Sequence, residues 1–375
     1  MDVEELAKTL ISFNTEIPPG NEEPCARYLR DYIEDLRLDG CVSDLHVFEP
    51  GRANLIVKVG PIEPGLLTSG HIDVVPAGNP ENWTSPAFEG RVRDGRIYGR
   101  GAADMKTGVA ALVKALESVR GKKLLRRLVF VATAGEEVGY DGISRLIKDK
   151  KVTHADAKYA VVAEPTEMRV VRGHKGAITL RVTFRGRSAH ASRPEFGTNA
   201  IENCSSFIGK LSSMWTEFGS AKHPDLGSTT ITPTVINGGT KSNVIPESCE
   251  LTIDSRTIPQ HSNRVIMDGI RSVLTRLRKS ETEFEARLEM MYPSDPLLVS
   301  RDDPFVRLME KISGSESTIA PYGTEAPFYE KLGMTPLVFG PGSVKQAHIA
   351  DEFVSVKDSA KSVRIYEALI RSVCL

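Results

Sequence analysis

Histidine and carboxylate side chains stand directly after several apolar runs of this sequence, where predicted strands end. The runs LLTSG, RLVFVATAG, YAVVA and PLVFG each lead to such residues, the last through a loop that contains glycine and proline. The residues are His71 and Asp73, Glu136 and Glu137, Glu164 and His348, together with Asp104 at the start of a predicted helix. Ligands bind at the carboxyl ends of the strands of an open parallel sheet, so these side chains would meet in space although they are far apart in sequence.

These side chains are suitable ligands for a pair of divalent metal ions. Histidine and carboxylate together suit zinc, cobalt or manganese, and the lack of clustered cysteines argues against a structural zinc site. One aspartate can bridge two ions in sites that hold both the attacking and the leaving oxygen. With Asp104 as the bridge, we expect His71 and Glu164 to bind one ion. We expect Glu137 and His348 to bind the other, which leaves room for water and so indicates a catalytic site.

Two carboxylates remain for other roles. Glu136 and Glu137 are adjacent in a tight turn and cannot easily face the same ion, so we expect Glu136 to act as the general base. We expect Asp73 to accept the second ring N–H of His71 and thereby to fix the tautomer of that ligand. Each residue alone also fits a simpler role, as a surface histidine, a solvated turn or a helix start. Their shared position at strand ends favours the active site.

Length and composition indicate the class of protein. The chain has 375 residues, enough for two domains, with 40% hydrophobic and 26% charged residues. The formal net charge of −1 gives no support for a nucleic-acid partner, and no apolar run approaches the roughly 18 residues of a membrane span. The first residues do not resemble a secretory signal, and the five cysteines are scattered. We therefore expect a cytoplasmic protein without nucleic-acid or membrane partners.

The elements that must position these residues fall into two groups. The apolar runs before the candidate ligands are nearly continuous, which is typical of strands covered on both faces in an α/β layered sheet. From about Gly176 the strands alternate, and the order β-α-β-β-α-β indicates a ferredoxin-like α+β domain. We expect this domain, residues 175–287, to be inserted into a discontinuous first domain that comprises residues 1–174 and 288–375.

Seven sequence blocks together resemble the M20 metallopeptidase and deacylase family. They are SGHIDVVPAG, YGRGAADMKTG, ATAGEEVGYDG, VVAEPT, GHKGAITLRVTFRGRSAHASRPEFGTNAI, SNVIPESCELTIDSRTIP and GPGSVKQAHIADE, in the order that the family has them. The resemblance implies a zinc-exopeptidase-like three-layer α/β catalytic domain and an inserted ferredoxin-like domain that forms a homodimer. It also implies two zinc ions, with cobalt as the alternative, on the five ligands predicted above. Glu136 is then the base and proton shuttle, and Asp73 orients a ligand.

The resemblance also implies roles for residues that the spacing does not single out. His190, in RSAHAS, would reach the active site of the neighbouring protomer and stabilise the tetrahedral oxyanion, and Arg256 and Asn243 would hold the substrate carboxylate. The stretch TEAPF, which contains Glu325, is similar to that of the acetylornithine deacetylase members. We expect Glu325 to favour a cationic group such as the ornithine amine. A buried loop carboxylate bonded to backbone is the alternative.

The sequence thus predicts a di-metal amidohydrolase that removes an N-acyl group from a small amino acid. N-Acetylornithine is the leading substrate. N-Succinyl-diaminopimelate is the nearest alternative within the family, followed by the substrates of a dipeptidase or carboxypeptidase. A non-catalytic binding relative would be expected to have lost ligands or the base, whereas all five ligands and Glu136 are present.

Overall fold

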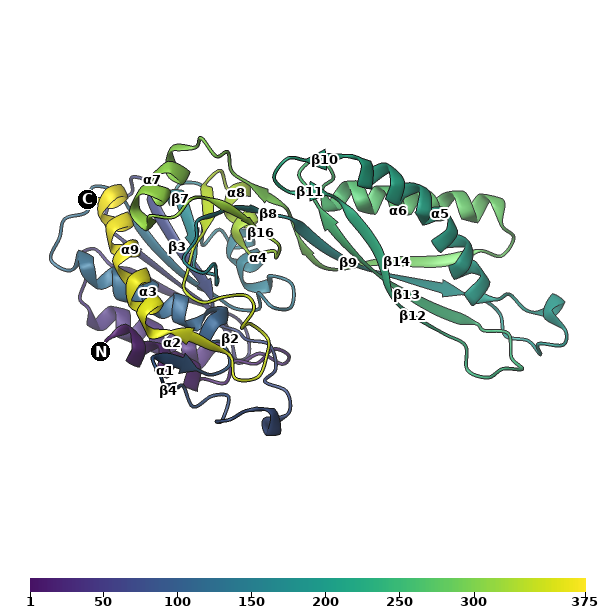
Figure 1. Cartoon of the computed structure of the whole chain (residues 1–375), viewed down its shortest axis with the longest axis horizontal. Coiled ribbons are helices and arrows are strands. Elements are labelled where there is room, and N and C mark those ends of the chain that lie inside the picture. The colour runs from purple at the N-terminus through teal and green to yellow at the C-terminus, as the bar shows by residue number, and fades with distance from the viewer. The chain divides into compact units, whose positions relative to one another are not determined.

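The computed structural model describes residues 1–375, apart from the side chains of Ser213 and Tyr292. The chain forms two compact units, the second inserted into the first (Figure 1). The large unit contains residues 1–173, 298–320 and 324–375, and the inserted unit contains residues 174–297 and 321–323. Residues 288–297, expected in the large unit, belong to the inserted unit because strand β14 (Glu285–Ser294) continues its pairing as far as Ser294.

A nine-stranded sheet forms the centre of the large unit. Its strands, in spatial order, are β1 (Val42–Glu49), β2 (Arg52–Val59), β6 (Leu128–Thr133), β3 (Gly65–His71), β7 (Ala157–Val162), β17 (Thr335–Val338), β8 (Val171–His174) and β15 (Leu297–Leu298), with β16 (Thr318–Ala320) beside β8. Strands β6, β3, β7 and β17 run parallel to one another. The carboxyl ends of these four strands therefore lie along one edge of the sheet.

Helices cover both faces of this sheet. They are α1 (Val3–Ser12), α2 (Glu23–Asp35), α3 (Thr107–Leu116), α4 (Asp141–Lys148), α7 (Pro304–Ser313), α8 (Ala326–Lys331) and α9 (Val356–Cys374). A Cβ atom at Gly70 would lie 2.5 Å from Met105 and 2.9 Å from Val109, so this face of β3 packs against α3. The adjacent Ser69 points to the other face, where its hydroxyl is 2.7 Å from that of Tyr329 on α8. The expected three-layer α/β arrangement is confirmed, and every residue of β3 and β6 is buried.

A small sheet joins two segments that lie next to candidate ligands in the sequence. It consists of β18 (Phe353–Ser355), β5 (Arg96–Tyr98) and β4 (Arg91–Arg93). The strand β5 comes shortly before Asp104, and β18 comes shortly after His348. Their antiparallel pairing sets Phe353 opposite Tyr98 and so brings these two distant segments together.

The inserted unit has the expected β-α-β-β-α-β order. Its main elements are β9 (Gly176–Arg185), α5 (Ala200–Ser220), β12 (Thr230–Gly238), β13 (Ser248–Thr257), α6 (Asn263–Ser280) and β14, with the short pair β10 (Lys222–His223) and β11 (Gly227–Ser228) after α5. The sheet order β12-β13-β9-β14, with every neighbouring pair antiparallel, is that of a ferredoxin-like fold. Buried residues of the sheet and both helices, including Phe184, Phe207 and Ile270, form its core. None of the described helices in either unit combines the length and apolar character that a membrane crossing requires.

Candidate metal centre

The parallel strands bring one histidine and one further carboxylate close to Asp104. His71 is the last residue of β3, and Glu164 lies two residues beyond β7. Asp104 lies in the turn that leads into α3. The Nε2 atom of His71 is 3.0 Å from Oδ1 of Asp104 and 3.9 Å from Oε1 of Glu164. This group corresponds to the first of the two ligand sets that the sequence predicts.

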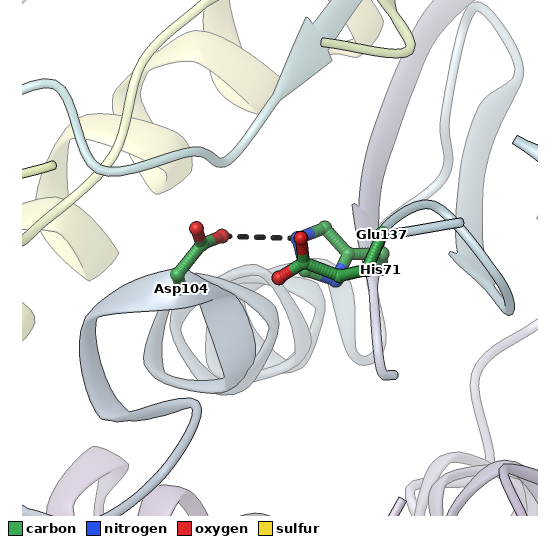
Figure 2. Close-up of side chains that lie close together, drawn as sticks. All are labelled: His71, Asp104 and Glu137. Carbon is green, nitrogen blue, oxygen red and sulfur yellow. Dashed lines mark hydrogen bonds and ion pairs between the residues drawn. The ribbon is translucent and has the colours of Figure 1, made fainter. Parts of the chain in front are cut away.

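A second histidine approaches the other oxygen of Asp104. The Nε2 atom of His348 lies 3.4 Å from Oδ2 of Asp104 and 3.0 Å from Oε1 of Glu137. One atom from each of His71, Asp104 and Glu137 lies within 4.8 Å of the others, and Figure 2 shows these side chains turned toward one another. Asp104 thus offers one carboxylate oxygen to each histidine, which is the arrangement that a bridging carboxylate requires.

Burial and crowding of negative charge govern the electrostatics of this cluster. Burial raises the pKa of Glu164 well above its usual value, and the charge of Asp104 adds to the rise. Burial would lower the pKa of His71, but its hydrogen bond with Asp104 and the charge of Glu164 raise that pKa well above the ordinary value. Hydrogen bonds with Asp104 and Glu137 raise the pKa of His348 to about 10. A divalent cation would compensate the negative charge that burial and mutual repulsion disfavour on these carboxylates, so the donor set fits the ions that the sequence predicts.

Asp73 is at the site, but its carboxylate contacts a different partner from the one expected. Its two oxygens accept the backbone N–H groups of Glu136 and Glu137 at 3.1 and 3.0 Å. The Nδ1 atom of His71 lies 3.0 Å from the backbone carbonyl oxygen of Asp73 and 3.7 Å from its carboxylate. The imidazole is therefore held by main chain, and the side chain of Asp73 instead satisfies two N–H groups of the turn after β6.

Glu136 lies in that same turn. Burial raises its pKa well above the usual value, the positive charge of His71 opposes this rise, and the charges of Glu137 and Asp104 add to it. Its backbone N–H shares the carboxylate of Asp73 with that of the proposed ligand Glu137, so the two residues extend from one restrained turn. A carboxyl group of this kind can both accept and return a proton.

Glu325 is buried beneath the strand ends and is only 1% exposed. Its carboxylate accepts hydrogen bonds from Thr133 at 2.8 Å, from Tyr329 at 3.2 Å and from the hydroxyl group of Ser69. These hydroxyl groups come from β6, α8 and β3. The expected contact with a substrate amine is therefore not supported, because the charge of Glu325 is already satisfied by hydroxyl groups inside the fold. The sequence suggested either recognition of a substrate amine or a buried carboxylate bonded to backbone, and neither role included hydroxyl partners.

His190 and Asn243 lie together in the inserted unit. The N–H of Ala191 donates to the carbonyl oxygen of Asn243 at 3.0 Å, and both His190 and Asn243 are exposed. The Nδ1 atom of His190 is 2.8 Å from the hydroxyl group of Ser192. Asn243 precedes the start of β13 at Ser248.

Arg256 is near the opposite end of β13. It pairs with Ala177 of β9, and its Nε atom is 3.1 Å from a carboxylate oxygen of Asp254. The extended chain from Ser248 to Arg256 spans about 26 Å. Within one copy of the inserted unit, Asn243 and Arg256 are therefore too far apart to contact the same small anion.

Sequence reasoning missed two functional candidates, Arg100 and Glu352. Glu352 accepts the backbone N–H groups of Ala103 and Asp104 at 2.8 and 3.0 Å, and its other oxygen is 2.6 Å from Nη1 of Arg100. The only sequence signal is an acidic residue directly before the apolar start of β18. That pattern is common in loops, and nothing in it indicates contact with residues about 250 positions earlier.

Comparison with known families agrees with the geometry. The sequence profile described as peptidase family M20/M25/M40 matches residues 67–372. The chain belongs to this family. The family resemblance drawn from the seven sequence blocks is thereby confirmed.

Individual relatives extend over nearly the whole chain. The acetylornithine deacetylase of Aliivibrio salmonicida (strain LFI1238) is 32% identical over 354 residues, 92% of this chain and 90% of the relative. Among solved structures, an M20 family metallo-carboxypeptidase from Sulfolobus solfataricus has a TM-score of 0.80 at 17% identity and covers 99% of both chains. A dinuclear metal-binding M20 peptidase from Bacillus subtilis has a TM-score of 0.69 at 14% identity, over 98% of this chain and 96% of the other. The protein is a metal-dependent hydrolase that acts on amide bonds, as the sequence predicts.

Proposed function

We propose that this protein removes the acyl group from a small N-acyl amino acid, with N-acetylornithine as the leading substrate. The observation that carries the proposal is the placement of Asp104 between His71 and His348, at 3.0 and 3.4 Å. This arrangement suits a two-ion hydrolytic site. The choice of acyl amino acid is supported by curated acetylornithine deacetylases that are 31–33% identical over most of the chain.

The five clustered side chains would hold two divalent ions, zinc or alternatively cobalt. His71, Asp104 and Glu164 form one ligand set, and Asp104, Glu137 and His348 form the other. When bound, the ions would polarise the amide carbonyl and make an attacking water more acidic. The protein's own contribution is to fix His71 at the end of the buried strand β3 and Glu164 two residues beyond β7, so that the sheet restrains both.

Glu136 would act as the general base. It would accept a proton from the attacking water and deliver it to the amine nitrogen that leaves. In the metal-free protein, burial raises the pKa of this carboxyl group and so increases its affinity for a proton. Asp73 supports this role because it holds the backbone N–H group of Glu136 and so restrains the turn from which the side chain extends.

The substrate carboxylate and the oxyanion would be bound with the help of a second copy of the chain. Asn243 and Arg256 are about 26 Å apart or more along one sheet, so both can hold one carboxylate only if they come from different copies. His190 adjoins Asn243 through the pairing of neighbouring residues. We assign Arg256 to one protomer, and His190 and Asn243 to its partner, with His190 stabilising the oxyanion.

Dimerisation through the inserted unit is supported by its exposed edge. Strand β12 is at the edge of its sheet and exposes 49% of Val235 and 53% of Ile236. Ile201, at the start of α5, is 38% exposed, and a Cβ atom at Gly238 of β12 would lie 3.1 Å from it. An edge strand with neighbouring apolar side chains is suited to pairing with a second copy.

A hydrolysis screen on metal-reconstituted protein tests this function. The panel should contain N-acetylornithine, N-acetylated neutral amino acids, N-succinyl-diaminopimelate and dipeptides, with the bound metal measured in each preparation. We expect the highest kcat/KM for N-acetylornithine. A Glu136→Gln preparation made in parallel controls for contaminating hydrolases. Efficient cleavage of dipeptides, or of the succinyl substrate, without deacetylation would overturn the proposed substrate.

A further inference from the structure

An ion pair that no part of the proposed mechanism uses is buried next to the metal centre. Arg100 is 2% exposed and Glu352 is fully buried, and their closest charged atoms are 2.6 Å apart. A buried ion pair carries a large desolvation cost and is weak evidence for stability by itself. The contacts that surround this pair indicate what it does.

Glu352 supplies a hydrogen-bond acceptor to the turn that carries Asp104. One of its carboxylate oxygens accepts the N–H groups of both Ala103 and Asp104, at 2.8 and 3.0 Å. The residues that precede this turn and α3 provide no side-chain cap of their own. The acceptor is instead delivered by a residue about 250 positions later in the sequence. The arrangement parallels that of Asp73, whose carboxylate also accepts two consecutive backbone N–H groups.

The same pair fastens the loop that carries His348. Arg100 donates to the carbonyl oxygen of Ile349 at 3.2 Å, and the N–H of Gly99 donates to the carbonyl oxygen of Glu352 at 3.0 Å. Arg100 also donates to Pro76 at 3.3 Å, in the segment that follows β3. A single guanidinium group therefore contacts the segments after two ligand histidines, and its carboxylate partner contacts the backbone of the bridging aspartate.

We propose that Arg100 and Glu352 are positioning residues that set Asp104 relative to His348. The proposal rests on the proposed two-ion function. The expected effect is on the affinity for the ion that Asp104 and His348 would both bind. Neither residue reaches the reacting atoms. The ligand set with Glu164 depends on this pair only through Asp104, because its histidine, His71, ends a buried strand. The set with His348 depends on the pair through both Asp104 and the loop of His348, so it should be affected more. Partners that orient metal ligands typically contribute about 10–100-fold to metal affinity.

Metal titration separates this role from a general contribution to stability. Metal-free wild type, Glu352→Gln and Arg100→Lys are titrated with Zn²⁺ in competition with a chromophoric chelator, which gives a dissociation constant for each site. We expect one dissociation constant to rise at least 10-fold in both variants and the other to change less than about 3-fold. Glutamine keeps one acceptor oxygen but replaces the other with a donor NH₂ group and loses the charge. Lysine keeps the charge but loses the forked geometry. Thermal unfolding of the metal-free proteins is measured alongside.

Asp156 provides the matched control. It is 2% exposed and is paired with Lys58 at 2.6 Å and Arg127 at 3.0 Å, just before β7 and so at the opposite end of the strands from the metal centre. Asp156→Asn should lower the Tm of the metal-free protein and leave both zinc affinities unchanged. If Glu352→Gln and Arg100→Lys behave like this control, the positioning role is wrong. A wild type that binds only one ion would instead contradict the two-ion function, and this inference with it.

Discussion

The carboxylate of Asp73 accepts the backbone N–H of Glu137 at 3.0 Å, across 64 positions of sequence. Its second oxygen accepts the N–H of Glu136 at 3.1 Å. The proposed base and a proposed metal ligand therefore extend from one turn that is held by one buried carboxylate. This contact links β3, which ends at His71, with the turn after β6.

Asp73→Asn tests the importance of this contact for activity. The single oxygen of asparagine can accept only one of the two backbone N–H groups. Its NH₂ group would face the other N–H, which is also a donor, so the turn must shift. We expect kcat to fall about 10–100-fold while the fold is retained. The measurement is steady-state kinetics on preparations of equal metal content. If kcat in this variant equals that of wild type, a single acceptor oxygen at position 73 is sufficient for activity.

Glu136→Gln separates catalysis from metal binding. The substitution keeps the size of the side chain but removes the group that accepts a proton, and none of the proposed ligands changes. We expect the bound metal per protomer to equal that of wild type and kcat to fall about 100–10,000-fold. Elemental analysis and kinetics on the same preparation provide the two readings. Loss of metal together with activity would instead identify Glu136 as a ligand.

The layered fold could be predicted from the sequence because its signals are local. Continuous apolar runs such as that of β6 report burial on both faces, and the alternating runs after Gly176 report a sheet with helices on one side. The end of the inserted unit that the sequence predicts, residue 287, lies inside β14. Pairing between strands, which continues to Ser294, is a long-range property that composition does not reveal.

The residues of the site were predictable to a large extent, and their partners were not. Strand ends indicate His71, Glu137 and Glu164 as candidate ligands, because topology brings those ends to one edge. The sequence does not show whether a carboxylate contacts a ring or a backbone N–H, so it does not reveal the bonds of Asp73 to the turn after β6. Nor does it show contacts such as those of Glu325 with hydroxyl groups or of Glu352 with Asp104, which depend on segments folded together from afar.

Removal of metal should destabilise the protein as well as inactivate it. Without a cation, the carboxylates of Asp104, Glu137 and Glu164 lie close together in a buried site and repel one another. Ions present at about 1,000 times their dissociation constant would add about 4 kcal/mol to the free energy of unfolding. We expect chelation to abolish hydrolysis and lower the Tm, and Zn²⁺ or Co²⁺ to restore both. An active protein that contains no measurable metal would contradict the proposed mechanism.

Glu325→Gln should affect stability rather than substrate choice. Its carboxylate accepts three hydroxyl groups, and the NH₂ group of glutamine would replace an acceptor with a donor in this buried network. We expect a loss of about 1–3 kcal/mol in the free energy of unfolding. The ratio of kcat/KM for N-acetylornithine over a neutral N-acetyl amino acid should stay constant. A selective fall in that ratio would restore the role in amine recognition that the sequence suggests.

Mixed dimers test whether His190 acts on the partner's active site. His190→Ala and Glu136→Gln should each be poorly active as homodimers, because each lacks one group in every site. In a heterodimer, the His190→Ala chain still has Glu136, and the Glu136→Gln chain still has His190. If His190 acts on the partner's site, these two groups meet, and one of the two sites is complete.

Co-expression of the two variants with different affinity tags allows the heterodimer to be isolated. Random pairing makes about half of the dimers mixed, so the unfractionated mixture should recover about a quarter of wild-type activity, and the purified heterodimer about half. Dimerisation of each variant is checked by light scattering. If His190 acts within its own protomer, the heterodimer contains no complete site and its activity stays at the level of the parents. We expect the heterodimer to recover activity, because Asn243 and Arg256 are too far apart along one sheet to serve the same site from one copy.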